Sequence, residues 1–173
     1  MATKILYIHG GADLYGASRV VLRIVTRLDK KVFEPYVILP YEGPLAEALR
    51  AEGVPTVIMK SLSVISRRVF HSWRIIPFLC MIPLSAIALL RFIKQHNIAL
   101  VHTNTGIIVS AGLAAKLAGV PHIWHVHDSF HDFRKLWKFY SKYILWSSDK
   151  VICVSSAIAK QFDGEAEKVG SGQ

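Results

Sequence analysis

The stretch WHVHD, residues 124–128, ends an apolar run on His125, His127 and Asp128. These side chains cost free energy to bury unless they pair with one another or with a ligand. Imidazole and carboxylate groups can transfer protons, bind metal ions or contact polar ligands near neutral pH. The stretch is therefore a candidate functional site, and its chemistry depends on the elements that surround it.

A metal site is one interpretation of the histidines at 122, 125, 127 and 131. On a strand, side chains alternate between faces, so His125 and His127 share one side while His122 points to the other. The chain has no H-E-x-x-H motif, no paired cysteines and no further carboxylate in ligand spacing. We therefore expect no metal ion at this site.

The loop GGADLYGASR, residues 10–19, is a second candidate site, because Gly16 immediately precedes a helical pattern. A glycine there lets backbone N–H groups approach a phosphate, which the helix N-terminus also favours. The glycine spacing fits neither the dinucleotide-binding fingerprint nor the P-loop. The alternative is that these glycines only make a turn.

Hydrophobic patterns predict the elements that hold these residues. Strands are expected at 4–9, 35–40, 55–60, 98–102, 122–127 and 150–154, and helices at 17–28, 44–53 and 131–147. This alternation predicts an α/β fold with a doubly wound, mostly parallel sheet of about six strands and helices on both faces. Ligands bind such sheets beyond the carboxyl ends of the strands. Three expected strands have polar residues there: His9-Gly10-Gly11, His102-Thr103-Asn104 and His125-Val126-His127-Asp128.

The composition is that of a globular protein. The chain has 173 residues, of which 52% are hydrophobic and 19% charged, so one domain with a substantial core is expected. Its two cysteines, Cys80 and Cys153, lie in apolar segments and favour a reducing compartment. The N-terminus enters a strand pattern without room for a signal peptide, so we expect a cytoplasmic protein.

Positive charge is concentrated in one part of the chain. The formal net charge is +9, and residues 53–127 contain no Asp or Glu. A basic and apolar segment attracts phosphates, lipid head groups or nucleic acid. The alternative is a solvated basic face without a specific partner. A nucleic-acid-binding domain is a further interpretation, for which this charge is the only indication.

The run IIPFLCMIPLSAIALL, residues 75–90, is uncharged and flanked by arginines. It is shorter than the roughly 20 residues of a membrane span, and a span would place the predicted strands on opposite sides of a membrane. It is expected to be either a buried crossover helix or a helix in the membrane interface. In the second case five residues would face the membrane: Arg67, Arg68, Trp73, Arg74 and Phe78.

Five segments together resemble the N-terminal, acceptor-side domain of family 4 glycosyltransferases, which have the GT-B fold. The resemblance extends from about residue 4 to residue 162. It rests on YGASRVVL, EGPLAEALRAEGV, LVHTNT, AAKLAGVPHIWHVHD and DKVICVSSAIAKQF, which occur in order and at suitable spacing.

The resemblance implies roles for particular residues. Gly16, with Gly11, would approach the donor diphosphate, and His127 would be the catalytic histidine that faces the transferred sugar and its phosphates. His125 would orient its neighbour or pack. Acceptor contacts are expected at four positions: His102, Thr103, Asn104 and Asp128.

The resemblance also implies a domain organisation. Residues 1–163 would form a Rossmann-like N-terminal domain, and 164–173 a tail or truncated linker toward a donor-binding domain. Enzymes of the family hold the nucleotide in that second domain, together with a pair of glutamates that has no counterpart in these 173 residues. The chain would then be a fragment or one subunit of a two-chain transferase, and inactive by itself.

The expected function follows from the resemblance. The chain would be the acceptor-binding domain of a retaining glycosyltransferase, of hexosyltransferase type, in polysaccharide biosynthesis. Its co-substrate would be a nucleotide-sugar and its acceptor lipid-linked or a polysaccharide, with no metal or other cofactor, because cationic groups and helix dipoles can stabilise a diphosphate. It would lie in the cytoplasm, peripheral on the inner face of the cell membrane, without nucleic acid as a partner. The alternative is a non-catalytic membrane-docking subunit that recruits a separate catalytic chain.

Overall fold

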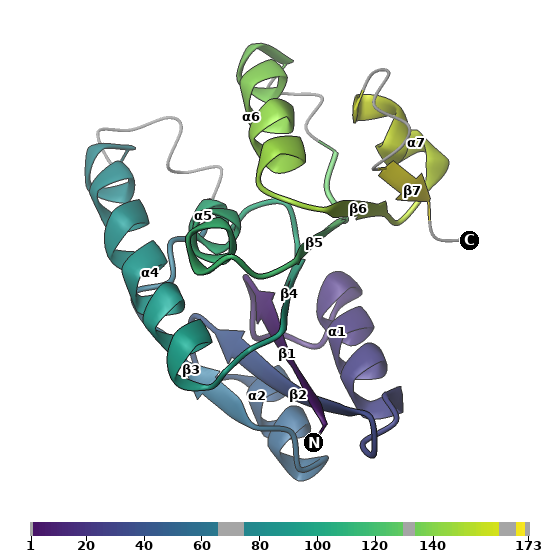
Figure 1. Ribbon diagram of the computed structural model, residues 1–173. Helices are drawn as coiled ribbons and strands as arrows, with labels where there is room; N and C mark the ends of the chain where they lie inside the picture. Colours follow the sequence, from purple (N-terminus) through teal and green to yellow (C-terminus); the bar gives the residue numbers. More distant parts are fainter. Residues whose placement is uncertain (1, 66–74, 130–133, 163–168, 172–173) are drawn as a thin grey trace.

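The computed structural model describes residues 2–65, 75–129, 134–162 and 169–171. These residues form one sheet of seven strands in the order β3-β2-β1-β4-β5-β6-β7, with every neighbouring pair parallel (Figure 1). The strands are β1 (Thr3–His9), β2 (Phe33–Leu39), β3 (Thr56–Ile58), β4 (Leu100–Asn104), β5 (His122–Val126), β6 (Lys150–Cys153) and β7 (Val169–Ser171). The predicted α/β fold with a parallel sheet is confirmed.

The helices connect successive strands. They are α1 (Gly16–Arg27), α2 (Pro44–Ala51), α4 (Ile75–Gln95), α5 (Val109–Ala118), α6 (Arg134–Trp146) and α7 (Ser156–Ala159), followed by a 3-10 turn at Lys160–Phe162. The six predicted strands are present with ends shifted by a few residues, as is usual for boundaries. The sequence did not predict β7, because three residues that include Gly170 are too short to show a periodicity.

The two faces of the sheet carry different helices. In β1, Ile5 and Tyr7 pack with α1 and α2 in one cluster, whereas Leu6 and Ile8 pack with α4 and α5 in the other. This division follows from the alternation of side chains along a strand. A third cluster joins α6 to β5 and β6 and includes the fully buried Trp124.

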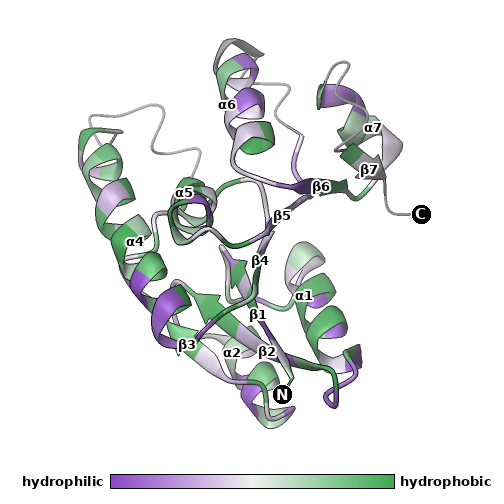
Figure 2. Cartoon of the chain, in the orientation of Figure 1, coloured by the Kyte–Doolittle hydropathy of each residue, from purple (hydrophilic) through white to green (hydrophobic). Residues whose placement is uncertain are grey.

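Helix α4 is buried on one side only. Its inner side chains are Ser85, Ala86, Leu89, Phe92 and Ile93, which are all buried. Its outer side chains Ile76, Leu79, Leu84 and Ile87 are 44% to 65% exposed. Figure 2 shows that most of the helix is hydrophobic and that its C-terminal end is polar.

By length and composition alone, Ile76–Gln95 could span a membrane, and 28% of its most apolar stretch is buried. The helix nevertheless leads from β3 to β4 of the same sheet and packs on α5. It is therefore a crossover helix of this domain with an open apolar face.

Candidate functional site

The strand register gathers polar residues at one edge of the sheet. His9 in β1 is opposite Asn104 in β4, and Asn104 is opposite His125 in β5. These are the carboxyl ends of their strands. Strands β1 and β4 are neighbours in the sheet but far apart in the chain, and in open parallel sheets the ligand crevice is expected at such a point, where the strand order reverses.

Asn104 lies at the centre of this group and is fully buried. Its backbone oxygen accepts a hydrogen bond from His9 Nδ1 (2.7 Å), and its side-chain Nδ2 donates to the Ala17 oxygen (3.0 Å). That second bond fixes the amide orientation, so Asn104 Oδ1 faces His127 Nε2 at 3.1 Å. An amide oxygen only accepts, which places the hydrogen of His127 on Nε2 and leaves Nδ1 as an acceptor.

His9 joins this group to the first loop. Its Nε2 lies 2.9 Å from Ser18 Oγ, and Ser18 Oγ donates to Asp13 Oδ1 at 3.0 Å. Burial lowers the pKa of His9, while its hydrogen bond to the Asn104 backbone and the Asp13 carboxylate oppose that shift. A hydrogen bond from the Tyr15 backbone is the main cause that lowers the pKa of Asp13. Burial opposes this shift, and the hydrogen bond from Ser18 adds to it.

His127 follows β5 and is half-buried. Burial, followed by repulsion from His125 and His9, lowers the pKa of His127 to about 4. The ring is therefore neutral at pH 7. A bound anion next to it would favour the protonated form and raise this pKa.

His102 and His125 pack behind His127. The His125 ring lies 4.3 Å from the His127 ring and 5.6 Å from the His102 ring. The Tyr7 ring lies 5.0 Å from the His102 ring. Within the described residues, His102 Nε2 and His125 Nδ1 are buried without a hydrogen-bond partner. Burial is the main cause that lowers the pKa of His102 to about 3, and the neighbouring histidines add to it.

The opposite face of the sheet holds Thr103 and His122. His122 Nδ1 donates to the Ser147 oxygen (2.7 Å), so its Nε2 accepts from Thr103 Oγ1 (2.8 Å). This arrangement agrees with the expected alternation, since His122 points away from His125 and His127. Its ring is buried and its two nitrogens are already paired.

The predicted acceptor-binding residues have different environments. Thr103 and Asn104 are fully buried and bonded within the protein, and His102 is buried in the row of rings. Asp128 is exposed as a residue, although its carboxyl is partly desolvated, which raises its pKa. Contact of these four residues with an acceptor stays a prediction.

The predicted phosphate-binding glycines lie in the loop between β1 and α1. Gly16 has φ 43°, a left-handed conformation that favours glycine, and a Cβ there would meet nothing within 4 Å. Tyr15, the N-cap residue of α1, makes no side-chain cap hydrogen bond. The first turn of α1 is thus not capped by Tyr15, although the Asp13 carboxylate next to it accepts from the Tyr15 N–H (3.0 Å). A Cβ on Gly11 would lie 3.8 Å from His9 Nε2.

The other candidate residues are outside this group. Arg67, Arg68, Trp73, Arg74 and His131 lie outside the described residues, whereas Phe78 is half-buried in α4. In the described ranges, no group of three or more His, Cys, Asp or Glu side chains could hold a metal ion. Ser155 caps α7 by accepting from the Ile158 N–H at 3.3 Å.

Comparison with protein families gives a match over most of the chain. The model described as Glycosyltransferase Family 4 matches residues 15–166. No curated protein sequence matches the chain.

Solved structures share the fold at low sequence identity. Anabaena Alr3699/HepE in complex with UDP and glucose is 17% identical with a TM-score of 0.72, and the alignment covers 98% of this chain and 44% of that protein. A glycosyltransferase from Rickettsia africae is 20% identical, with a TM-score of 0.69 and coverage of 98% and 42%. A UDP-N-acetylglucosamine 2-epimerase is 10% identical, with a TM-score of 0.64 and coverage of 98% and 47%. The chain thus spans less than half the length of these proteins, and the likeness concerns the fold, which is that of a GT-B glycosyltransferase domain.

Proposed function

Since the chain belongs to Glycosyltransferase Family 4, we propose that it is the acceptor-binding domain of a retaining hexosyltransferase that uses a nucleotide-sugar donor. One observation carries this proposal: the Asn104 side chain contacts both the first turn of α1, at the Ala17 oxygen, and His127 Nε2, so the N-terminus of α1 and His127 lie close together. The Anabaena protein, whose structures contain UDP or UDP-glucose, supports the choice of donor.

The proposed chemistry assigns a task to each group at the crevice. The backbone N–H groups near Gly11 and Gly16, at the positive end of the α1 dipole, would hold the donor diphosphate. His127 would contact the transferred sugar and its phosphates, and its pKa would rise as negative charge develops there. Such preorganised donors can stabilise a leaving diphosphate without a metal ion, so none is proposed.

A second domain is part of the proposal. The chain covers 44% of the Anabaena protein, so a separate donor-binding domain, fused or on another chain, would hold the nucleotide and supply the pair of glutamates. Residues 1–163 would form the acceptor-side domain together with β7, which pairs with β6 and so belongs to the sheet rather than to the tail expected at 164–173. The acceptor would be a lipid-linked glycan or a polysaccharide.

A membrane surface is the proposed location of this domain. On α4, exposed apolar side chains recur at helical spacing at Ile76, Leu79, Leu84 and Ile87, and the exposed Arg91 follows one turn later. A stripe of this kind fits an anionic membrane surface on the cytoplasmic side. It also favours the second candidate function, a non-catalytic docking subunit that recruits a catalytic chain.

Turnover of the complete enzyme distinguishes the two functions. We expect His127→Ala to lower sugar transfer by about two orders of magnitude, because a ring that gains a proton on Nδ1 next to the donor phosphates would act as a transition-state donor, and the variant loses it. His125→Ala is the matched control, because it removes a packed ring and should lower stability more than turnover. The assay measures nucleoside diphosphate released by the chain together with its donor-binding domain. Wild-type turnover from His127→Ala would remove His127 from the reaction and favour the docking subunit.

A further inference from the structure

An open pocket of about 420 Å³ lies between the β1–α1 loop and the β2–α2 loop. Its volume falls within the range of small-molecule sites. The residues that line it come from both loops and the starts of α1 and α2: Ala12, Asp13, Leu14, Tyr15, Arg19, Tyr41, Glu42, Gly43 and Pro44. The pocket is therefore at the same edge of the sheet as His127, but it contains none of the residues assigned to the donor or the acceptor above.

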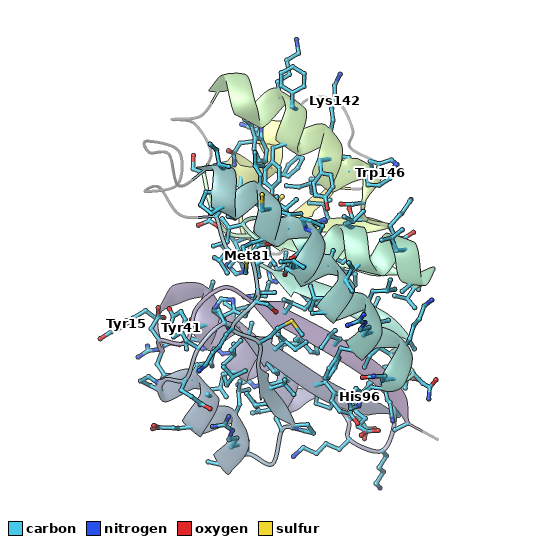
Figure 3. All side chains as sticks on the ribbon, turned by 90° about the vertical axis from the view of Figure 1, so that its left-hand side faces the viewer. Tyr15, Tyr41, Met81, His96, Lys142 and Trp146 are labelled. Carbon is cyan, nitrogen blue, oxygen red and sulfur yellow. The ribbon has the colours of Figure 1, made fainter. Side chains whose placement is uncertain are left out.

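Two tyrosines give the pocket an aromatic lining. Tyr15 is 78% exposed and Tyr41 is 54% exposed. Figure 3 shows both side chains on the same side of the molecule, far from Lys142 and Trp146. Aromatic rings this exposed are rarely needed for folding, and their faces can stack against the C–H groups of a sugar ring.

Fixed polar groups surround the two rings. Arg19 Nε donates to the Leu14 oxygen (2.7 Å), and no described residue accepts from its terminal nitrogens. Arg50 holds the Glu42 carboxylate through two bonds of 2.8 Å and 2.9 Å. The pocket thus offers donors and acceptors suited to hydroxyl groups. Arg50 neutralises Glu42, and Asp13 balances Arg19, so the pocket has no excess positive charge that would favour a phosphate or a uronic acid over an uncharged ligand.

The backbone makes the pocket rigid. The Leu45 N–H donates to the Ala12 oxygen at 2.9 Å, which ties one loop to the other. A Cβ on Gly43 would lie 2.7 Å from the same oxygen, so only glycine permits this approach of the two backbones. Binding to a preformed site costs little free energy for the ordering of side chains and loops.

Hydrogen bonds connect the pocket to the catalytic histidine. Asp13, which lines the pocket, accepts from Ser18, and Ser18 contacts His9. His9 donates to Asn104, whose side chain accepts from His127. A ligand in the pocket therefore lies at the end of a network that orients His127.

We propose that this pocket binds an uncharged pyranose ring of the acceptor glycan, stacked between Tyr15 and Tyr41. The identity of the ligand as an acceptor rests on the proposed glycosyltransferase function. The binding of the sugar itself rests on the pocket alone.

Saturation-transfer NMR on the chain, with methyl α-glycosides of glucose, mannose and galactose as probes, tests the proposal. We expect ring-proton signals from at least one glycoside at millimolar concentration. The double variant Tyr15→Ala/Tyr41→Ala should bind it at least about fivefold more weakly. Phe139→Ala is the control, since Phe139 is 76% exposed on α6, outside the pocket, and should leave binding unchanged.

Three results would overturn the proposal: no transfer to any glycoside, undiminished binding by the double variant, or displacement of the glycoside by inorganic phosphate. A UDP titration of the same samples tests the donor side separately. Glycoside binding without any response to UDP would count against the proposed function and leave the sugar site standing.

Discussion

At the residue scale, Asn104 determines how His127 presents its two nitrogens. Its amide is oriented by the Ala17 carbonyl and accepts the His127 Nε2 hydrogen. His127 Nδ1 is thus left as an acceptor at the crevice. The tautomer of a histidine is commonly set by the partner of its other nitrogen.

Substitution of Asn104 should change the titration of His127. Asn104→Asp places a carboxylate next to Nε2 and should raise the His127 pKa above its present value of about 4. Asn104→Ala removes the acceptor and should allow both neutral tautomers. Nitrogen-15 NMR of the His127 ring over a pH series measures both effects, with Ser141→Ala on α6 as a control outside the site. An unchanged tautomer and pKa in both variants would show that Asn104 does not orient His127.

At this scale the sequence predicted which residues gather at the strand ends, but not the hydrogen bonds that connect them. Alternation and the rule on strand ends favoured both His125 and His127, and the choice of His127 came from the resemblance to family 4 glycosyltransferases. The bonds between His9 and Asn104 join residues 95 positions apart, and no local pattern encodes such a distance. Asp13 and Ser18 were missed although they are close to His9 in the chain and lie in the loop GGADLYGASR that the sequence had singled out.

At the element scale, α4 combines the two interpretations that the sequence left open. One side packs on α5 as a crossover helix should, and the other leaves apolar side chains exposed. The apolar composition of α4 predicted that a helix forms there. Which of its sides is buried depends on the elements that pack beside it. β7 could not be predicted from the sequence, because it has three residues and is a strand only through its pairing with β6.

The exposed stripe of α4 should bind anionic membranes. We expect the purified chain to float with anionic vesicles, less so at high salt because head-group attraction is screened. The triple variant Leu79→Ser/Leu84→Ser/Ile87→Ser should bind at least about tenfold more weakly, since fully burying one such side chain contributes about 1.5–3 kcal/mol. Leu117→Ser is a matched control, because Leu117 is exposed on α5. The membrane proposal fails if the wild-type chain stays unbound at low salt or if the control loses binding equally.

At the scale of the whole molecule, burial of several histidines in one small domain couples folding to pH. Burial is the main cause that lowers the pKa of His102 to about 3 and of His122 and His127 to about 4. Their pKa in the unfolded chain is about 6.5. Below that pH the unfolded chain binds protons that the folded chain excludes.

The contribution of these histidines to stability should therefore be constant above about pH 6.5, and stability should fall as the pH drops toward 4. Each of the three histidines contributes a slope of about 1.4 kcal/mol per pH unit between its two pKa values. Urea unfolding over a pH series measures the total slope. His102→Phe keeps a ring beside Tyr7 and removes one titrating group. The free energy of unfolding of this variant should therefore change with pH by about 1.4 kcal/mol per pH unit less than that of the wild type. Equal slopes for wild type and variant would contradict the depressed pKa of His102.

The central claim is that the carboxyl edge of this sheet is the acceptor-side half of a glycosyltransferase site. NMR titration of the isolated chain with UDP-glucose tests it most directly. We predict millimolar affinity, because a few phosphate contacts in an open crevice must offset the whole entropic cost of association. The shifts should be confined to Gly11, Gly16, His127 and their neighbours, and sugar transfer should be absent. Micromolar affinity, or shifts centred away from this edge, would contradict the account.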